Sequence, residues 1–221
     1  MSKAMPHRGF ALFMEQRTGK TKTALAIAEK RGVKRLLILC PKIAIRVWKT
    51  ELRFEGLSTR MHAQVLTYEY AANHIEELLD PARKPEMIIA DESQRIKRRT
   101  SARSKAAREL AAACRYTLAL TGTPMDKHQD VWAQFDFLNP RLFGTWEEFR
   151  NRFLQTQLVK LPPKRIQQQD GSFKVFARKP FLKILGLQKR RTDEFNRLFH
   201  SIAFRVTLEE VKEEKTAIRH I

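Results

Sequence analysis

The stretch that decides the fold is Phe10-Ala-Leu-Phe-Met-Glu-Gln-Arg-Thr-Gly-Lys-Thr-Lys-Thr-Ala-Leu25. Residues 10–14 are all apolar, as expected for a strand that is buried on both faces of a parallel sheet. Gly19 marks a turn, and residues 21–31 have the composition of a helix that Gly32 ends. The stretch therefore predicts a buried strand, a turn and a helix in direct succession.

The turn contains Gly19-Lys20-Thr21, which is typical of a loop that binds phosphate groups. Backbone N–H groups at the helix start would cradle the phosphates, Lys20 would neutralise the β/γ charge, and the Thr21 hydroxyl would ligate Mg²⁺. The full pattern has a glycine where this chain has Met14. A bare Gly-Lys-Thr also occurs by chance, so the prediction depends on its place between strand and helix. The expected nucleotide-binding residues of the loop are Arg17, Thr18, Gly19, Lys20, Thr21 and Lys22.

Two adjacent carboxylates, Asp91 and Glu92, follow the apolar run 87–90. In open α/β sheets, ligands bind at the carboxyl ends of the strands. We expect Asp91 to hold Mg²⁺ together with Thr21, and Glu92 to orient and deprotonate the water that attacks a γ-phosphoryl group. Both carboxylates are thus nucleotide-binding candidates, and Glu92 and Lys20 are the catalytic candidates. A solvated Asp-Glu pair at a strand end is also common, so this prediction depends on the phosphate loop.

A third motif, Thr121-Gly122-Thr123-Pro124, follows the apolar run 116–120. It could be only a Gly-Pro turn. Alternatively, its hydroxyls sense phosphate or link the nucleotide site to a bound strand of nucleic acid.

Buried strands alternate with helices over the first two thirds of the chain, which predicts an α/β layer fold with right-handed crossovers. The expected strands are Phe10–Met14, Leu36–Cys40, Gln64–Thr67, Met87–Ala90 and Tyr116–Leu120. The expected helices are Thr21–Arg31, Ile43–Phe54, Tyr70–Leu79 and Ser101–Cys114. We predict one unit over residues 1–140 and a mainly helical extension over 141–221. This extension would contain a capped helix at Thr145–Phe153, an exposed loop or hairpin at 161–172, helical spacing from Phe181, and a helix at Thr192–His200.

The chain is strongly basic. Its 221 residues include 43 Lys and Arg against 24 Asp and Glu, a net charge of +19, which favours a polyanionic partner such as nucleic acid. Six positive charges and no negative one lie between Arg95 and Lys105; no aromatic residue interleaves with them, so phosphate-backbone contact is expected there rather than base stacking. Trp132, Phe135 and Phe137 lie at helical spacing and are expected in the core. The 2 cysteines and the scattered histidines fit neither a disulfide framework nor a structural zinc, and the apolar runs are too short for a membrane span.

Taken in order and spacing, these motifs resemble the first RecA-like lobe of superfamily-two helicases, in the variant of Swi/Snf-type DNA translocases, especially phage and bacterial ones. The similar segments are Glu15-x-x-Thr18-Gly19-Lys20-Thr21, Leu39-Cys40-Pro41, Asp91-Glu92-Ser93-Gln94-Arg95-Ile96-Lys97 and Thr121–Pro124. The phosphate loop of this family also lacks the first glycine, which accounts for Met14. Further similarity is found at Leu66-Thr67-Tyr68-Glu69, Gly186, Asp193–Asn196 and Ile202–Val211.

The resemblance implies ATP and Mg²⁺ as cofactors, a mostly parallel sheet flanked by helices, and DNA, duplex in form, as the partner. It places Pro41, Lys42 and Trp48 near the DNA backbone. The expected nucleic-acid contacts are Pro41, Lys42, Lys97, Arg98, Arg99, Arg103, Thr121, Gly122 and Thr123.

The family has a second lobe that supplies arginines to the γ-phosphate and an adenine-reading glutamine ahead of the phosphate loop. Only a few residues precede the first strand here, and the sequence stops at Ile221, where the second lobe would begin. The resemblance therefore implies half a motor that binds nucleotide without efficient hydrolysis, as a fragment, a split gene product or a reduced homologue, with a partner chain as one source of the second lobe.

Two other interpretations stay open at this level. A non-catalytic DNA-binding or regulatory subunit would keep the shape of the lobe without its chemistry. A P-loop kinase or unrelated nucleotide hydrolase would explain the loop and the carboxylates, but neither Thr121–Pro124 nor the basic run. We expect a cytoplasmic protein of a bacterium or a phage-infected cell.

Overall fold

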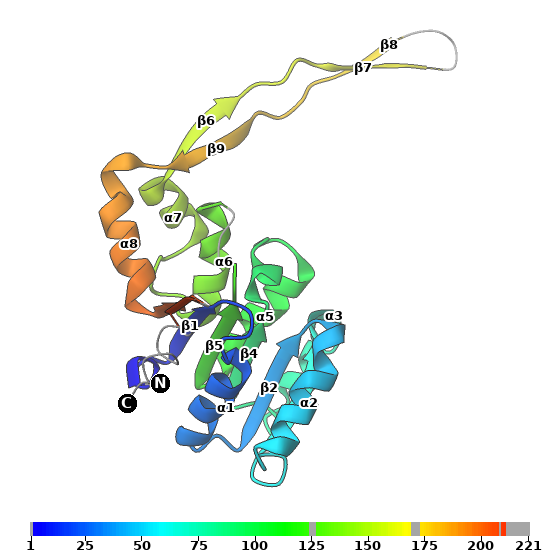
Figure 1. The fold of residues 1–221 in the computed structure, drawn as a ribbon. Coiled ribbons are helices and arrows are strands. Elements are labelled where there is room, and N and C mark those ends of the chain that lie inside the picture. The colour runs from blue at the N-terminus through cyan, green and yellow to red at the C-terminus, as the bar shows by residue number, and fades with distance from the viewer. Residues whose placement is uncertain (1, 124–126, 169–172, 208, 211–221) are drawn as a thin grey trace.

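The computed structural model describes residues 2–123, 127–168, 173–207 and 209–210 (Figure 1). Its centre is a sheet of six strands, and every pair of neighbours in it is parallel. In spatial order the strands are β10 (Ala203–Val206), β1 (Gly9–Met14), β5 (Tyr116–Thr121), β4 (Met87–Asp91), β2 (Arg35–Cys40) and β3 (His62–Thr67). The predicted α/β class and the five predicted strands are confirmed.

The apolar runs form strands because both faces of the sheet are covered. All six residues of β1 are buried, and so are the apolar residues of β2, β4 and β5 apart from the half-buried Tyr116. Such strands need no polar alternation, since neither face meets water.

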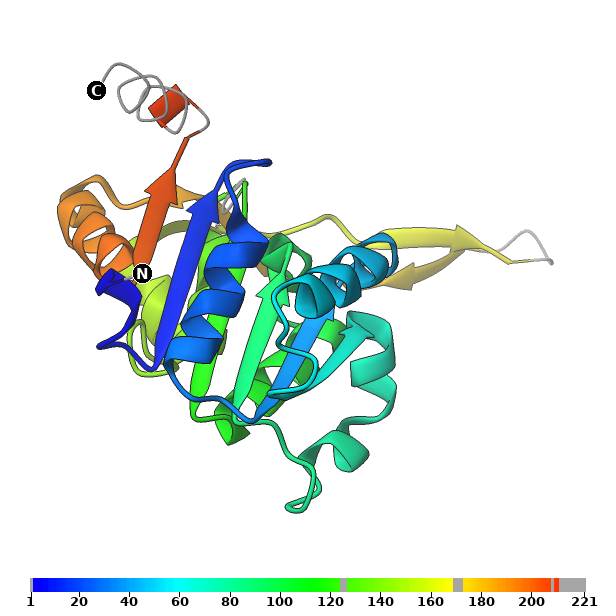
Figure 2. The same ribbon diagram turned by 60° about the horizontal axis from the view of Figure 1, so that its bottom comes forward.

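Helices lie on both faces of the sheet (Figure 2). The helices are α1 (Lys20–Lys30), α2 (Ile45–Phe54), α3 (Tyr68–Asn73), α4 (Ile75–Leu79), α5 (Ala102–Ala113), α6 (Gln129–Leu138), α7 (Trp146–Phe153) and α8 (Thr192–Ser201). The connections through α1 and α2 advance along the sheet in one direction, whereas α5 leads from β4 back to β5. Right-handed crossovers therefore place α1 and α2 on one face and α5 on the other.

The helix predicted at residues 70–79 is two short helices, α3 and α4, separated by His74. Thr67 caps α3, since its hydroxyl accepts a hydrogen bond from the Tyr70 N–H at 3.1 Å. At His74 the backbone leaves helical geometry, and the imidazole ring stacks on the Tyr70 ring with 3.9 Å between centroids. The ring of His74 also bonds to the Tyr70 carbonyl through Nδ1.

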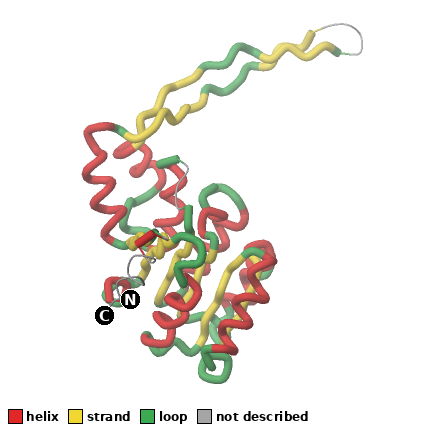
Figure 3. Tube along the Cα trace, viewed as in Figure 1, coloured by secondary structure: helices red, strands yellow, loops and turns green. Residues whose placement is uncertain are grey.

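The prediction of a mainly helical extension after residue 140 needs correction (Figure 3). Helix α7 begins at a capping box of Thr145 and Glu148, as predicted, and α8 lies at the predicted position. Strands β6 (Leu154–Val159), β7 (Lys164–Gln167), β8 (Phe173–Phe176) and β9 (Phe181–Leu187) form an antiparallel ribbon, and β10 returns to pair with β1. The apolar residues from Phe181 onward suggested a helix, but pairing with β6 makes them a strand.

An aromatic cluster holds α6, α7 and α8 against the sheet. Phe195 of α8 is fully enclosed and lies within ring-contact distance of Phe143, Phe149 and Phe153. Buried aromatic pairs add to the stabilisation that comes from area burial. The core assignment of Trp132, Phe135 and Phe137 is confirmed, because all three are buried. None of the helices in the described ranges combines the length and the apolar character needed to cross a bilayer.

Candidate nucleotide site and nucleic-acid surface

The predicted phosphate loop and carboxylate pair lie at the same edge of the sheet. Strands β1, β5 and β4 are neighbours and run parallel. The segments that leave their carboxyl ends therefore meet, and these are the loop at 15–19, the turn at 121–123 and the pair Asp91-Glu92. Burial raises the pKa of Asp91, and the positive charge of Lys20 offsets part of that rise.

The phosphate loop is built by left-handed backbone conformations. Arg17 has φ of 66° and Gly19 has φ of 86°, and Lys20 begins α1 directly after them. No side chain caps the start of α1, and its first turn contains no acidic residue. The N–H groups of this turn therefore face outward with the positive end of the helix dipole, which suits a phosphate.

The ammonium of Lys20 is held inside the loop. Its Nζ donates to the carbonyl oxygens of Met14 at 2.8 Å and Glu15 at 3.1 Å. The Thr18 hydroxyl also donates to the Glu15 carbonyl, at 2.6 Å. These bonds keep the Lys20 ammonium beside the loop that leads into the first turn of α1.

Asp91 is anchored by two residues that were not predicted as members of the site. The Trp48 indole donates to Asp91 Oδ2 at 2.8 Å, and the Tyr68 hydroxyl donates to the Asp91 carbonyl at 2.6 Å. Trp48 is 1% exposed, so its side chain is not available to contact a DNA backbone directly. Its spacing from Pro41 was visible in the sequence, but its partner was not, because α2 and β4 meet only in the folded chain.

Opposing effects act on the Asp91 carboxyl. Burial raises its pKa, and the Trp48 hydrogen bond and the Lys20 charge lower it, while Glu92 raises it. The thiol of Cys40 lies near enough for Asp91 to add to the effect of burial, which brings the pKa of this cysteine to about 12. Cys40 therefore stays a neutral thiol.

Glu92 occupies an unusual backbone conformation, with φ of 52° in the left-handed region. A non-glycine residue there costs about 1 kcal/mol or more and is a frequent feature of functional sites. Gln94 holds the Glu92 carboxylate, since its Nε2 donates to Glu92 Oε2 at 2.7 Å. The same Gln94 accepts a hydrogen bond from the Thr121 hydroxyl at 2.6 Å, which ties the carboxylate to the end of β5.

The turn after β5 lies against the phosphate loop. A Cβ added to Gly122 would come within 3.5 Å of the Met14 carbonyl oxygen. Thr121 is buried, and its hydroxyl also accepts a hydrogen bond from the Thr123 N–H at 3.0 Å. The expected nucleic-acid contact of the Thr121 side chain needs correction, since this hydroxyl links parts of the site; Gly122 is half-buried and Thr123 exposed. Pro124 lies outside the described residues.

The side-chain oxygen atoms at this edge of the sheet suit a magnesium ion that also binds a nucleotide. The described residues contain no group of three or more His, Cys, Asp or Glu that could enclose a metal ion. One threonine hydroxyl and one or two carboxylates, completed by phosphate oxygens and water, are the kind of set that Mg²⁺ uses in nucleotide sites. Thr21 and Asp91, both half-buried at this edge, are therefore suitable ligands.

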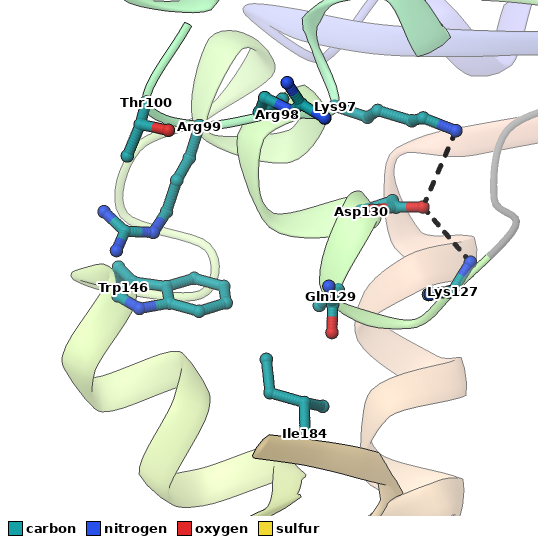
Figure 4. A pocket seen from close by; sticks show the side chains of 9 residues that line it. All are labelled: Lys97, Arg98, Arg99, Thr100, Lys127, Gln129, Asp130, Trp146 and Ile184. Atoms are coloured by element: carbon teal, nitrogen blue, oxygen red, sulfur yellow. Dashed lines mark hydrogen bonds and ion pairs between the residues drawn. The ribbon is translucent and has the colours of Figure 1, made fainter. Parts of the chain in front are cut away.

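The residues of the basic run between Arg95 and Lys105 differ in their contacts, since within the described part of the chain some pair with carboxylates and others do not. Arg98 and Arg99 are exposed, and the Arg99 guanidinium lies 4.8 Å from the centre of the Trp146 ring. Lys97 pairs with Asp130 at 3.9 Å, and Arg103 pairs with Glu69 at 3.2 Å. The residues Lys97–Thr100 border a hollow of about 390 Å³ whose other walls include Trp146 and Ile184 (Figure 4). Beyond the end of β2, the neighbour of β4, Lys42 is exposed and Pro41 half-buried.

Replacing Trp48 with phenylalanine is expected to raise the pKa of Asp91 further, because the bond that stabilises its charged form is lost. The carboxyl chemical shift of Asp91, followed by NMR over a pH series, measures the change. Trp132→Phe is the matched control, since the Trp132 indole donates to Gly144 and not to Asp91. Equal pKa values in wild type and Trp48→Phe would contradict the assignment.

Comparison with known proteins gives one family. The model of the SNF2-related domain matches residues 52–215. The DNA annealing helicase and endonuclease ZRANB3 of Mus musculus is 31% identical over 161 residues, which are 63% of this chain and 15% of that protein. The chromatin-remodeling ATPase INO80 of Saccharomyces cerevisiae strain S288c is 32% identical over 117 residues, 51% of this chain and 7% of that protein. The chain thus spans a small part of these relatives.

Among solved structures, the Sulfolobus solfataricus SWI2/SNF2 ATPase core in complex with dsDNA is similar in fold. The match has a TM-score of 0.68 at 23% identity and covers 92% of this chain and 41% of that one. At this identity the similarity establishes the fold, which is that of a RecA-like lobe with a parallel central sheet.

Proposed function

Because this chain belongs to the SNF2-related family, we propose that it forms the ATP-binding lobe of a DNA-dependent ATPase that translocates along duplex DNA. The observation that carries the proposal is that Lys20 and the Asp91-Glu92 pair lie at one edge of the sheet. Gln94 hydrogen-bonds the Glu92 carboxylate to Thr121 at the end of β5, the strand between them.

ATP is the substrate in this proposal. The first turn of α1 and the Lys20 ammonium bind its phosphates, and the flanking residues Arg17, Thr18, Gly19 and Lys22 shape the loop or line it. Thr21 and Asp91 hold the magnesium ion, which when bound neutralises charge on the phosphate oxygens. Glu92 orients the attacking water and accepts its proton.

DNA is the partner, bound through its backbone. Arg98 and Arg99 beyond β4, Pro41 and Lys42 beyond β2, and Gly122 and Thr123 beyond β5 flank the nucleotide site. Cations that contact phosphate groups position a protein on DNA without reading its sequence. Lys97 and Arg103 contribute only if DNA displaces their carboxylate partners.

The chain of Glu92, Gln94 and Thr121 supplies a physical link between the two sites. A shift of the turn at Thr121–Thr123 on DNA would be passed to the Glu92 carboxylate through two short hydrogen bonds. We expect the ATP-binding lobe alone to hydrolyse ATP slowly, since in the family a second lobe supplies arginines to the γ-phosphate.

Lys20→Ala tests the proposal. Loss of a charged donor to phosphate is expected to weaken MgATP binding about 10- to 100-fold, measured by titration calorimetry. Lys30→Ala, at the other end of α1, removes the same charge away from the site and should change little. Absence of MgATP binding in the wild type, or equal affinity in Lys20→Ala, would favour a non-catalytic DNA-binding subunit; hydrolysis with no response to duplex DNA would favour another class of nucleotide hydrolase.

A further inference from the structure

A long two-stranded ribbon projects from the body of the protein (Figure 1). We call it the arm and define it by the described residues 154–168 and 173–187, which contain β6, β9, β7 and β8. Every residue in the ranges 160–168 and 173–183 is exposed. A ribbon with both faces in water gains little stability from burial, which makes its side chains candidates for contact with another molecule.

The arm is uniformly basic. Its described part contains no carboxylate. Its cations are Lys160, Lys164, Arg165, Lys174, Arg178, Lys179 and Lys183. Positive charges without nearby carboxylates are not satisfied within the arm, and they repel one another unless a polyanion neutralises them.

The arm also carries most of the large hydrophobic side chains that are exposed in the described structure. Of the 13 large hydrophobic side chains that are exposed in the described structure, 9 lie on it. Three are rings: Phe173 is 62% exposed, Phe181 47% and Phe176 42%. Apolar groups gathered on one element in water indicate a binding surface.

Each face of the ribbon of β7 and β8 carries at least one cation beside one aromatic ring, with Phe176 on one face and Phe173 on the other. In the register of β7 and β8, Lys164 lies opposite Phe176 and Lys174 lies opposite Ile166, so these four side chains share one face. The Lys174 ammonium lies 5.6 Å from the centre of the Phe176 ring. Aromatic faces interleaved with cations are the means by which proteins bind single strands, since bases stack on the rings while the cations contact phosphates.

The base of the arm continues into the nucleic-acid surface proposed above. Ile184 of β9 borders the same hollow as Arg98, Arg99 and Trp146 (Figure 4). A second hollow, of about 610 Å³, lies between residues 127–129 and residues 182–186. A strand held along the arm would therefore reach the edge of the sheet where the nucleotide site lies.

We propose that the arm binds a single-stranded segment of nucleic acid by stacking unpaired bases on Phe173, Phe176 and Phe181 and by pairing its cations with phosphate groups. The inference rests on the proposed function only in taking DNA as the ligand. Charge argues against a second copy of the chain as the occupant, because two arms that meet would bring together two sets of cations with no described carboxylate between them.

Fluorescence anisotropy with labelled oligo-dT and with a duplex of equal length tests the proposal. The first variant is Phe173→Ala/Phe176→Ala/Phe181→Ala, and stacking predicts that its Kd for oligo-dT rises at least about 10-fold, with duplex binding little changed. The second variant is Lys174→Gln/Arg178→Gln/Lys179→Gln. It is expected to reduce the slope of log K against log salt by about 2, since each phosphate contact on a single strand contributes about 0.7.

Two controls make the result specific. Lys30→Gln/Lys34→Gln/Lys84→Gln removes the same charge from exposed positions at the opposite edge of the sheet and should leave the salt slope unchanged. Replacing the three phenylalanines with leucine keeps apolar area without rings, and affinity for oligo-dT should still fall.

Several outcomes would overturn the proposal. Wild-type affinity for oligo-dT in the alanine or leucine variants would exclude stacking, and an equal loss on duplex would indicate groove contact instead. Self-association by the arm, seen as a dimer in analytical ultracentrifugation that the alanine variant abolishes, would assign the surface to a second copy. MgATP binding is measured on every variant: it should stay unchanged in the arm variants, while Lys20→Ala should lose MgATP and keep oligo-dT, so the two proposals fail separately.

Discussion

Glu92→Gln is expected to slow ATP hydrolysis about 10²- to 10⁴-fold while MgATP affinity stays within a few-fold of the wild type. Glutamine has the shape of glutamate and keeps an oxygen that can accept the Gln94 hydrogen bond, so the left-handed turn at residue 92 can persist. It cannot take a proton from water. In the proposed function, binding depends instead on Lys20, Thr21 and the first turn of α1, which the substitution does not touch.

Single-turnover hydrolysis of labelled ATP, with duplex DNA present, measures this effect even where turnover is slow, and calorimetry measures the affinity. Glu29→Gln is the control, because Glu29 is exposed on α1 and pairs with Arg60. A hydrolysis rate within a few-fold of the wild type would mean that another group orients the water. Loss of MgATP affinity would instead make Glu92 a binding residue.

Gly9→Ala is expected to lower the free energy of unfolding by about 3 kcal/mol or more. A Cβ at residue 9 would lie 2.1 Å from the Leu138 carbonyl oxygen and 2.5 Å from the Thr117 hydroxyl. These two atoms already form a buried hydrogen bond of 3.1 Å. Backbone atoms cannot rotate aside as a side chain can, so β1 or the end of α6 must move.

Urea unfolding followed by circular dichroism measures this loss. Gly32→Ala is the matched control: Gly32 has φ of 65° but open space around its Cβ position, so only the backbone cost of about 1–2 kcal/mol is expected. If Gly9→Ala were no more destabilising than Gly32→Ala, the close approach of α6 to β1 would be wrong.

The strands could be predicted from the sequence because a strand buried on both faces is almost entirely apolar. This is a local property, which can be recognised without knowledge of the fold. The positions of the carboxylates and of the phosphate loop could also be predicted, since each follows such a strand directly. Prediction failed at residues 181–187, where apolar spacing alone cannot separate a helix from a strand whose partner, β6, lies some distance earlier in the chain.

Local chemistry therefore determined which residues could bind a nucleotide and at which strand ends they lie. The tertiary structure alone decided how they are connected. Placing β5 between β1 and β4 brings Thr121 and Gly122 between the loop and the carboxylates, and packing α2 against the sheet brings Trp48 to Asp91. The separation of two residues along the sequence does not reveal such contacts. Strand order and helix packing arise because all the apolar faces are buried together. The arm is the opposite case, since residues that could have formed part of a core extend into water with their charges and rings exposed.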